Sequence, residues 1–206
     1  MNFDLTEDQE MLRESFARFL DAESSMARVR AAEAGDGFDR ALWQGLAGQG
    51  ALLIRMPEDA GGLGLGTFDS AVLMEEAGRT LVSGPLAEAI VALRALALSG
   101  GAGDVLEAAA AGETLVSLAL HDVATTPRQW IAGGAVADHV LGRRGDALIL
   151  YALPEGARGE PNLASTAIAE IDLGALDGTV LASGAEAVAL HQAAVEEWKL
   201  LIAAAL

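Results

Sequence analysis

The spacing of apolar residues changes twice along this chain of 206 residues, and this change constrains the fold more than any other feature. Up to about Gly112 apolar residues recur every three or four positions, which is typical of helices. They then form short runs of strand length to about Gly184, after which helical spacing returns. We therefore expect an α+β fold: an N-terminal helical bundle (1–112), a small antiparallel β domain (113–184) and a single C-terminal helix (185–206).

Start signals for helices support the predicted bundle. Thr6, with Gln9 three residues later, has the pattern of a capping box, and Asp39 and Thr67 fit the N-caps of two further helices. The run 86–98 is apolar on nearly every face, so we expect this helix to be central and buried.

The predicted β domain contains one clear hairpin. Residues 140–141 and 147–151 have strand composition and flank the turn-like sequence RRGD. Residues 168–173 and 178–181 show weaker strand patterns.

The C-terminal helix carries an apolar stripe at helical spacing, formed by Val188, Val195, Trp198 and Ile202. The chain stops inside this helix without a C-cap, so we expect the stripe to pack against helices that the chain lacks. Because an exposed apolar face usually finds a partner, the stripe predicts a homo-oligomer formed partly through this helix.

Composition excludes several classes of function. Thirty acidic residues against thirteen basic ones give a net charge of −17, which argues against a nucleic-acid partner. The absence of cysteine excludes disulfides, thiolate metal sites and a cysteine nucleophile, and it suits the cytoplasm. We find no signal peptide and no uncharged apolar run long enough to span a membrane.

No local motif identifies a reaction. The glycine-rich run 61–66 allows two interpretations, a phosphate-binding loop or a conformational turn, and the departures from G-x-G-x-x-G favour the turn. His121, His139 and His191 are scattered rather than spaced as metal ligands, so we predict no metal site. No G-x-S-x-G elbow is present, and sequence alone pairs no carboxylates into an acid–base dyad.

Four collinear segments nevertheless resemble the acyl-CoA dehydrogenase family. They are LTEDQ at 5–9, similar to the family's LTEEQ; MPEDAGGLG at 56–64, similar to PEEYGGLG; EEAGR at 75–79 with SGPL at 83–86; and EWKLL at 197–201. The resemblance covers essentially the whole chain, in the family's helical, β and helical order. It implies an incomplete version of that fold, truncated within the C-terminal helical bundle.

The resemblance implies a FAD enzyme that dehydrogenates acyl-CoA thioesters between the α and β carbons. Members are normally homotetramers or dimers that share FAD across subunits. The family's catalytic glutamate lies further along the C-terminal bundle than this chain extends, so we assign no catalytic residue and promote neither Glu196 nor Glu197.

Two family segments that contact the flavin are altered. ALHD at 119–122 stands where the family has A-L-T-E, which places the imidazole of His121 where a hydroxyl would bond the flavin. RQWIAGGAVAD at 128–138 keeps a tryptophan and an isoleucine but has Ala132 in place of Thr or Ser. By resemblance, the FAD-binding positions are Leu120, His121, Trp130, Ile131 and Ala132.

Three hypotheses follow from these matches and departures. The chain is an acyl-CoA dehydrogenase, or a piece of one, that uses FAD and acyl-CoA. Alternatively, it is a non-catalytic subunit that pairs with a full-length acyl-CoA dehydrogenase, or it is an inactive truncated member of the family.

Overall fold

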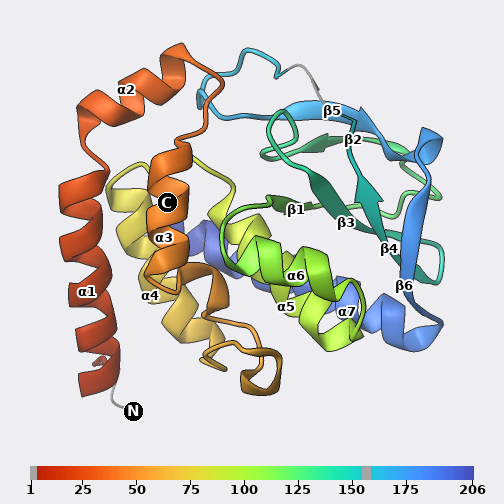
Figure 1. Cartoon of the computed structure of the whole chain (residues 1–206), viewed down its shortest axis with the longest axis horizontal. Helices are drawn as coiled ribbons and strands as arrows, with labels where there is room; N and C mark the ends of the chain where they lie inside the picture. Colours follow the sequence, from red (N-terminus) through yellow and green to blue (C-terminus); the bar gives the residue numbers. More distant parts are fainter. Residues whose placement is uncertain (1–3, 155–158) are drawn as a thin grey trace.

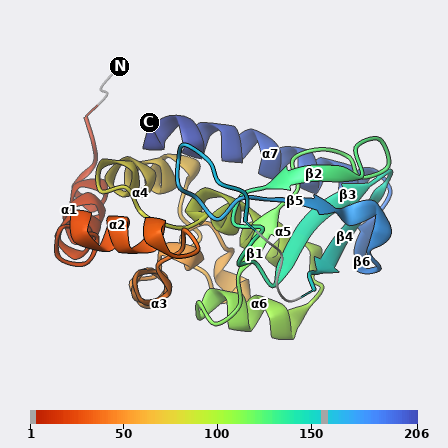
Figure 2. The same ribbon diagram turned by 90° about the horizontal axis from the view of Figure 1, so that it is seen from above.

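The computed structural model describes residues 4–154 and 159–206, which form a helical half and a β half (Figure 1). Helices α1 to α4 gather at one end and the strands lie at the other. Seen from above, α7 runs along one side of the molecule from the strands to α4, while α6 lies on the opposite side (Figure 2). This arrangement confirms the α+β prediction, and the proposed boundaries after 112 and 184 stay predictions.

Three of the seven helices described, α1, α2 and α3, begin at residues whose side chains cap them. Their bounds are α1 Glu7–Glu23, α2 Met26–Ala34, α3 Arg40–Gly48, α4 Thr67–Arg79, α5 Leu86–Ser99, α6 Gly103–Ala110 and α7 Ala185–Ala205, with short 3-10 turns at Ala51–Leu53, Glu58–Ala60 and Leu173–Ala175. The capping box of Thr6 with Gln9 and the Asp39 cap are confirmed. The Thr67 cap is wrong by one position: Gly66 is the N-cap, and its N–H donates to Asp69 at 2.7 Å.

The β half consists of a four-stranded sheet and a two-stranded one. The strands are β1 Val116–Leu118, β2 Arg128–Ile131, β3 His139–Arg144, β4 Ala147–Ala152, β5 Ala169–Asp172 and β6 Gly178–Ser183. The larger sheet has the order β1-β3-β4-β6, and β2 pairs with β5 in the smaller one. The predicted hairpin is confirmed as β3 and β4, and most pairings are antiparallel. The β1–β3 pair is parallel, so the larger sheet is mixed.

Helix α5 is the centre of the core, as its apolar composition predicts. Ile90, Leu93 and Leu96 on α5 are all at most 1% exposed and belong to one cluster with residues from α1, α3, α4 and α7. Each Å² of apolar surface removed from water contributes about 25 cal/mol to stability. Because this cluster is larger than the second one in the β half, it contributes the larger share.

The glycine-rich run is a conformational turn. The N–H groups of residues 61 to 66 all donate to acceptors inside the protein, such as Gly62 to Pro57 O and Gly64 to Met56 O. Gly61 and Gly64 have φ of 82° and 60°, a conformation that glycine adopts without strain. With these donors engaged, the run does not form a phosphate-binding cradle, and that interpretation is wrong.

The expectation that the stripe on α7 needs absent helices is also wrong. Val195, Trp198 and Ile202 pack against the main core, and Leu201 is fully buried. Helix α7 lies against α4, α5 and the strands of the larger sheet. The pattern predicts an apolar face correctly, but it does not say which element covers that face.

The described helices include none long and apolar enough to cross a lipid bilayer.

Candidate functional site

Two segments that the resemblance assigns to FAD lie side by side at the β half. Residues 119–121 continue from β1, and Ala132 follows β2. The side chain of Gln129 on β2 bridges them, accepting from His121 N at 3.0 Å and donating to His121 O at 2.9 Å. Ser117 Oγ donates to Ala132 O at 2.6 Å. The structure therefore brings Leu120, His121, Trp130, Ile131 and Ala132 together, and their role in binding FAD stays a prediction.

The side chains at this surface differ in how far they are exposed to solvent. Trp130 is 54% exposed and His121 is exposed, whereas Leu120 and Ala132 are half-buried. Ile131 is fully buried and packs beneath the surface. An exposed indole suits stacking against a flat ring or an apolar side chain of another molecule.

The hydrogen-bonding groups at positions 121 and 132 do not match those that would bind a flavin ring. A protein tunes and orients a flavin with hydrogen bonds to its ring atoms. Here the main-chain N–H of His121 is already bonded to the Gln129 side chain, an imidazole replaces the hydroxyl at position 121, and Ala132 has a methyl group in place of a hydroxyl. The aromatic face of Trp130 and the exposed imidazole of His121 are the groups that remain open to a ligand.

A buried histidine anchors α7 to this surface. Nε2 of His191 lies 2.7 Å from Ala119 O, and because a carbonyl only accepts, this nitrogen carries the proton and donates. Burial lowers the pKa of His191, and the hydrogen bond to Ala119 opposes the shift. The neutral imidazole therefore fixes the start of the segment that leads to Leu120 and His121. The sequence gives no signal for this contact.

A second buried polar cluster, the Arg55–Glu197 clamp, consists of Arg55, Thr67, Arg94 and Glu197. Arg55 donates to Glu197 Oε1 and to the main-chain oxygen of Leu65. Thr67 Oγ1 lies 3.1 Å from Arg55 and 3.3 Å from Glu197 Oε1, and Arg94 lies 3.5 Å from Oε2. The side chains of Arg55 and Glu197 are only 12% and 7% exposed. Both carboxylate oxygens of Glu197 face arginines, so this residue ties α7 to Arg55 and Arg94.

A cavity of about 470 Å³ lies among α2, α4, α5 and α7, and most of its lining is apolar. Glu88 on α5 belongs to this lining although it is only 5% exposed. Its Oε1 accepts a hydrogen bond of 2.7 Å from Trp198 Nε1. Burial raises the pKa of the Glu88 carboxyl, and the bond from Trp198 opposes the rise. Sequence reasoning missed Glu88, whose signal is a carboxyl near the start of a helix that is mostly apolar.

Within residues 4–154 and 159–206, no group of three or more histidine, aspartate or glutamate side chains could hold a metal ion.

Sequence comparison places the chain among dehydrogenases. Residues 6–103 match the model of the acyl-CoA dehydrogenase N-terminal domain. The chain is 34% identical over 146 residues to the acyl-CoA dehydrogenase IpdE2 of Mycolicibacterium smegmatis, an alignment of 70% of this chain and 45% of that protein. It is 29% identical over 175 residues to the benzylmalonyl-CoA dehydrogenase of Aromatoleum aromaticum, covering 71% of this chain and 46% of that protein. The chain thus spans about half the length of these curated relatives.

Solved structures share the fold. The structure named Tcur3481-Tcur3483 steroid ACAD superposes with a TM-score of 0.77 at 24% identity, covering 97% of this chain and 64% of that one. The ChsE4-ChsE5 complex from Mycobacterium tuberculosis gives 0.70 at 22% identity, covering 92% and 61%. The matched N-terminal domain, the aligned relatives of the same name and the shared fold lead to one conclusion: the chain belongs to the acyl-CoA dehydrogenase family.

Proposed function

We propose that this chain is a non-catalytic subunit of a heteromeric acyl-CoA dehydrogenase, in which a partner dehydrogenase supplies the FAD chemistry. The observation that carries the proposal is the altered surface at His121 and Ala132. The main-chain N–H of His121 is bonded internally, its imidazole replaces a hydroxyl, and Ala132 lacks a hydroxyl, while the helices around α5 form a buried core. A subunit that has lost its flavin contacts but kept its scaffold suits a partner role.

Two further observations support a partner role. The structures named Tcur3481-Tcur3483 and ChsE4-ChsE5 complex each carry the names of two proteins. Trp130 presents an exposed indole, the type of side chain that often anchors an interface. As part of the same proposal we place the assembly in the cytoplasm, since a chain without cysteine is compatible with a reducing compartment.

The alternative function is an acyl-CoA dehydrogenase that binds FAD and acyl-CoA itself. Trp130 and Ile131 favour it, because both keep the residue type of the family segment that contacts the flavin. Flavin content separates the two proposals. A non-catalytic subunit purified alone has no flavin absorbance, whereas a dehydrogenase in its own right is yellow with about one flavin per chain.

The partner proposal is tested by co-expressing the tagged chain with a full-length acyl-CoA dehydrogenase encoded beside it. We expect the two to co-purify, with flavin in the complex and none in the tagged chain alone. Trp130→Glu should reduce the recovered partner at least tenfold, because it places a charge in an apolar contact. Met11→Glu is the matched control, since Met11 is a similarly exposed apolar residue on α1. Failure to co-purify, or flavin bound to the chain alone, overturns the proposal.

A further inference from the structure

A small hollow lies where helix α3 meets the start of the β half. It measures about 230 Å³, and most of its lining surface is polar. One wall belongs to α3, and the other belongs to residues just before β1 and β3. Sites for drug-sized ligands typically measure ~300–1,000 Å³, so this hollow suits a smaller and more polar molecule.

A buried indole N–H without a partner lies at this hollow. Trp43 lines it and is 3% exposed, and its Nε1 bonds to no atom in the part of the chain that the structure describes. The indole edge that carries this nitrogen faces Gly112, another lining residue, because a Cβ there would lie 3.6 Å from Cδ1 of Trp43, the carbon next to Nε1. The opposite edge faces Gly84, outside the lining, where a Cβ would lie 3.2 Å from Cε3. Since buried donors in proteins are nearly always bonded, the acceptor is a water or an atom of a ligand.

The α3 wall adds a positive charge to this donor. Arg40 lines the hollow three residues before Trp43, and residues three apart share one face of a helix. Nη1 of Arg40 donates to Asp36 at 2.8 Å, and the guanidinium lies 5.3 Å from the centre of the Phe38 ring. Among the described residues, Nε and Nη2 of Arg40 have no acceptor, so both can donate to a ligand.

The wall on the β half is acidic. Glu113 and Asp138 line it, and neither forms an ion pair within residues 4–154 and 159–206. The Asp138 carboxylate is held in place, because its Oδ2 accepts a hydrogen bond of 2.8 Å from Leu115 N. Its Oδ1 stays available to a donor on a ligand.

The two walls together select a dipolar molecule. A simple anion would be attracted to Arg40 but repelled by the two carboxylates. A simple cation would be repelled by Arg40 and would leave the Trp43 N–H without an acceptor. A molecule with an anionic end and a cationic end matches both walls at once.

We propose that this hollow binds a small α-amino acid, of the size of glycine or alanine, as its zwitterion. The carboxylate of the ligand accepts hydrogen bonds from Trp43 Nε1 and from Arg40, and its ammonium group donates to Asp138 and Glu113. None of the lining residues belongs to the positions that the resemblance assigns to FAD. The inference goes beyond the partner role and does not rest on it, because the site lies within a single chain.

The test follows the indole N–H signals of the three tryptophans by ¹H–¹⁵N correlation NMR while glycine is added to the purified chain. Trp43→Phe removes one of the three signals and thereby identifies it. We expect glycine to shift the Trp43 signal with a millimolar Kd and to leave the signals of Trp130 and Trp198 in place. Acetate and methylammonium each carry one end of the ligand, so both should bind at least about tenfold more weakly.

Two outcomes of this titration overturn the proposal. A Trp43 signal that stays in place up to ~100 mM glycine, far above a millimolar Kd, means that the hollow holds only water. An equal response to acetate means that the site takes simple anions and does not recognise a zwitterion.

A pair of variants tests the acidic wall without changing Trp43. Asp138→Asn keeps an oxygen that accepts from Leu115 N but loses the charge, so glycine should bind about tenfold more weakly. Asp146→Asn is the matched control, because Asp146 is exposed between β3 and β4 and lies outside the lining. Equal Kd values for Asp138→Asn and the unmodified chain overturn the role of Asp138. Since the chain is tested alone, these results are independent of whether a partner dehydrogenase binds.

Discussion

At the scale of single residues, Glu88 shows how far burial changes the chemistry of a side chain. It lies on α5, which is otherwise apolar apart from Arg94 and Ser99, and it accepts a hydrogen bond from the Trp198 indole. No cation is needed to hold it, since a buried carboxyl can remain protonated instead of ionising. Its chemistry therefore depends on pH, and so does its effect on stability.

Glu88 should make the fold less stable as the pH rises. Its pKa is raised by folding, so between about pH 4.5 and the raised value the folded chain keeps a proton that the unfolded chain has lost. The free energy of unfolding falls across that interval. Glu88→Gln lacks this effect, so its advantage over the unmodified chain should grow with pH, by ~1.4 kcal/mol for each pH unit of the shift.

Urea denaturation of both proteins at several pH values measures this difference. Glu75→Gln is the matched control, because Glu75 is exposed on α4. A constant difference between Glu88→Gln and the unmodified chain from acid to alkaline pH would contradict the prediction.

At the scale of elements, the Arg55–Glu197 clamp joins three parts of the chain. Arg55 precedes the glycine-rich turn, Arg94 lies on α5 and Glu197 lies on α7. Thr67, the first residue of α4, takes part through its hydroxyl. The clamp sets how α7 lies against the helical half, and through His191 the same helix is bonded to Ala119.

Removing the acid of the clamp should destabilise the protein strongly. Glu197→Ala leaves the nearly buried Arg55 guanidinium without its anion, which we expect to lower the free energy of unfolding by ~3 kcal/mol. Glu196→Ala should change it by less than ~0.5 kcal/mol, because Glu196 is 71% exposed and pairs only with Lys199 on the surface. Chemical denaturation of the two variants provides the comparison, and equal losses would refute the structural role of the clamp.

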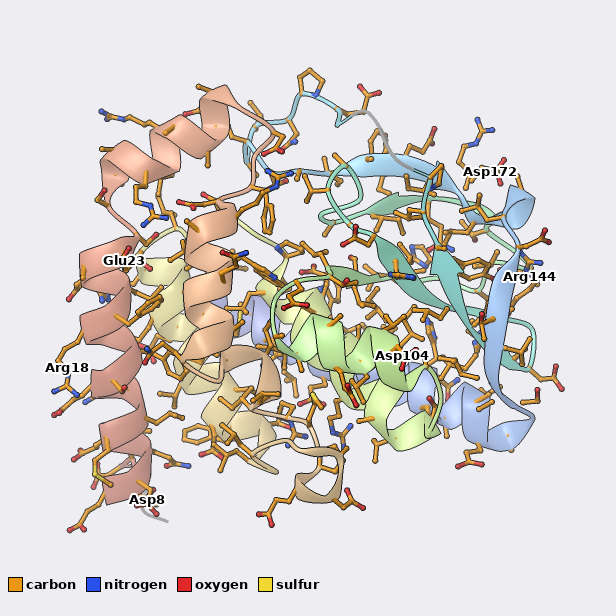
Figure 3. The ribbon with its side chains drawn as sticks, in the orientation of Figure 1. Asp8, Arg18, Glu23, Asp104, Arg144 and Asp172 are labelled. Atoms are coloured by element: carbon orange, nitrogen blue, oxygen red, sulfur yellow. The ribbon has the colours of Figure 1, made fainter. Side chains whose placement is uncertain are left out.

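At the scale of the whole molecule, the net charge of −17 spreads over both halves. Asp8 on α1, Asp104 on α6 and Asp172 on β5 lie far apart on the surface (Figure 3). Ion pairs such as Arg28 with Asp39 neutralise the charge locally. The excess of acids over bases remains, and like charges repel in the compact state.

Salt should therefore stabilise this chain. Raising NaCl from about 10 mM to about 300 mM shortens the screening length severalfold and weakens the repulsion between acidic side chains. We expect the Tm to rise by about 3 °C, equivalent to ~1 kcal/mol for a chain of this size. Thermal unfolding followed by circular dichroism tests this, and the same salt series near the pI of about 4.3, where the net charge vanishes, is the control. A Tm that falls with salt would mean that attractive ion pairs outweigh the repulsion.

The sequence by itself determined the order of helices and strands, the caps at Thr6 and Asp39, the β3–β4 hairpin and the family motifs. These features depend on residues close together in the chain, whose propensities and spacing act locally. The tertiary structure decided which elements cover α7 and which acceptors bond the N–H groups of the glycine-rich turn. It also decided which side chains bond Glu88 and Glu197. Trp198 reaches Glu88 across 110 positions and Arg55 reaches Glu197 across 142, so local pattern could not specify these contacts. Desolvation and hydrogen bonding act on what lies near in space, and folding alone brings those residues together.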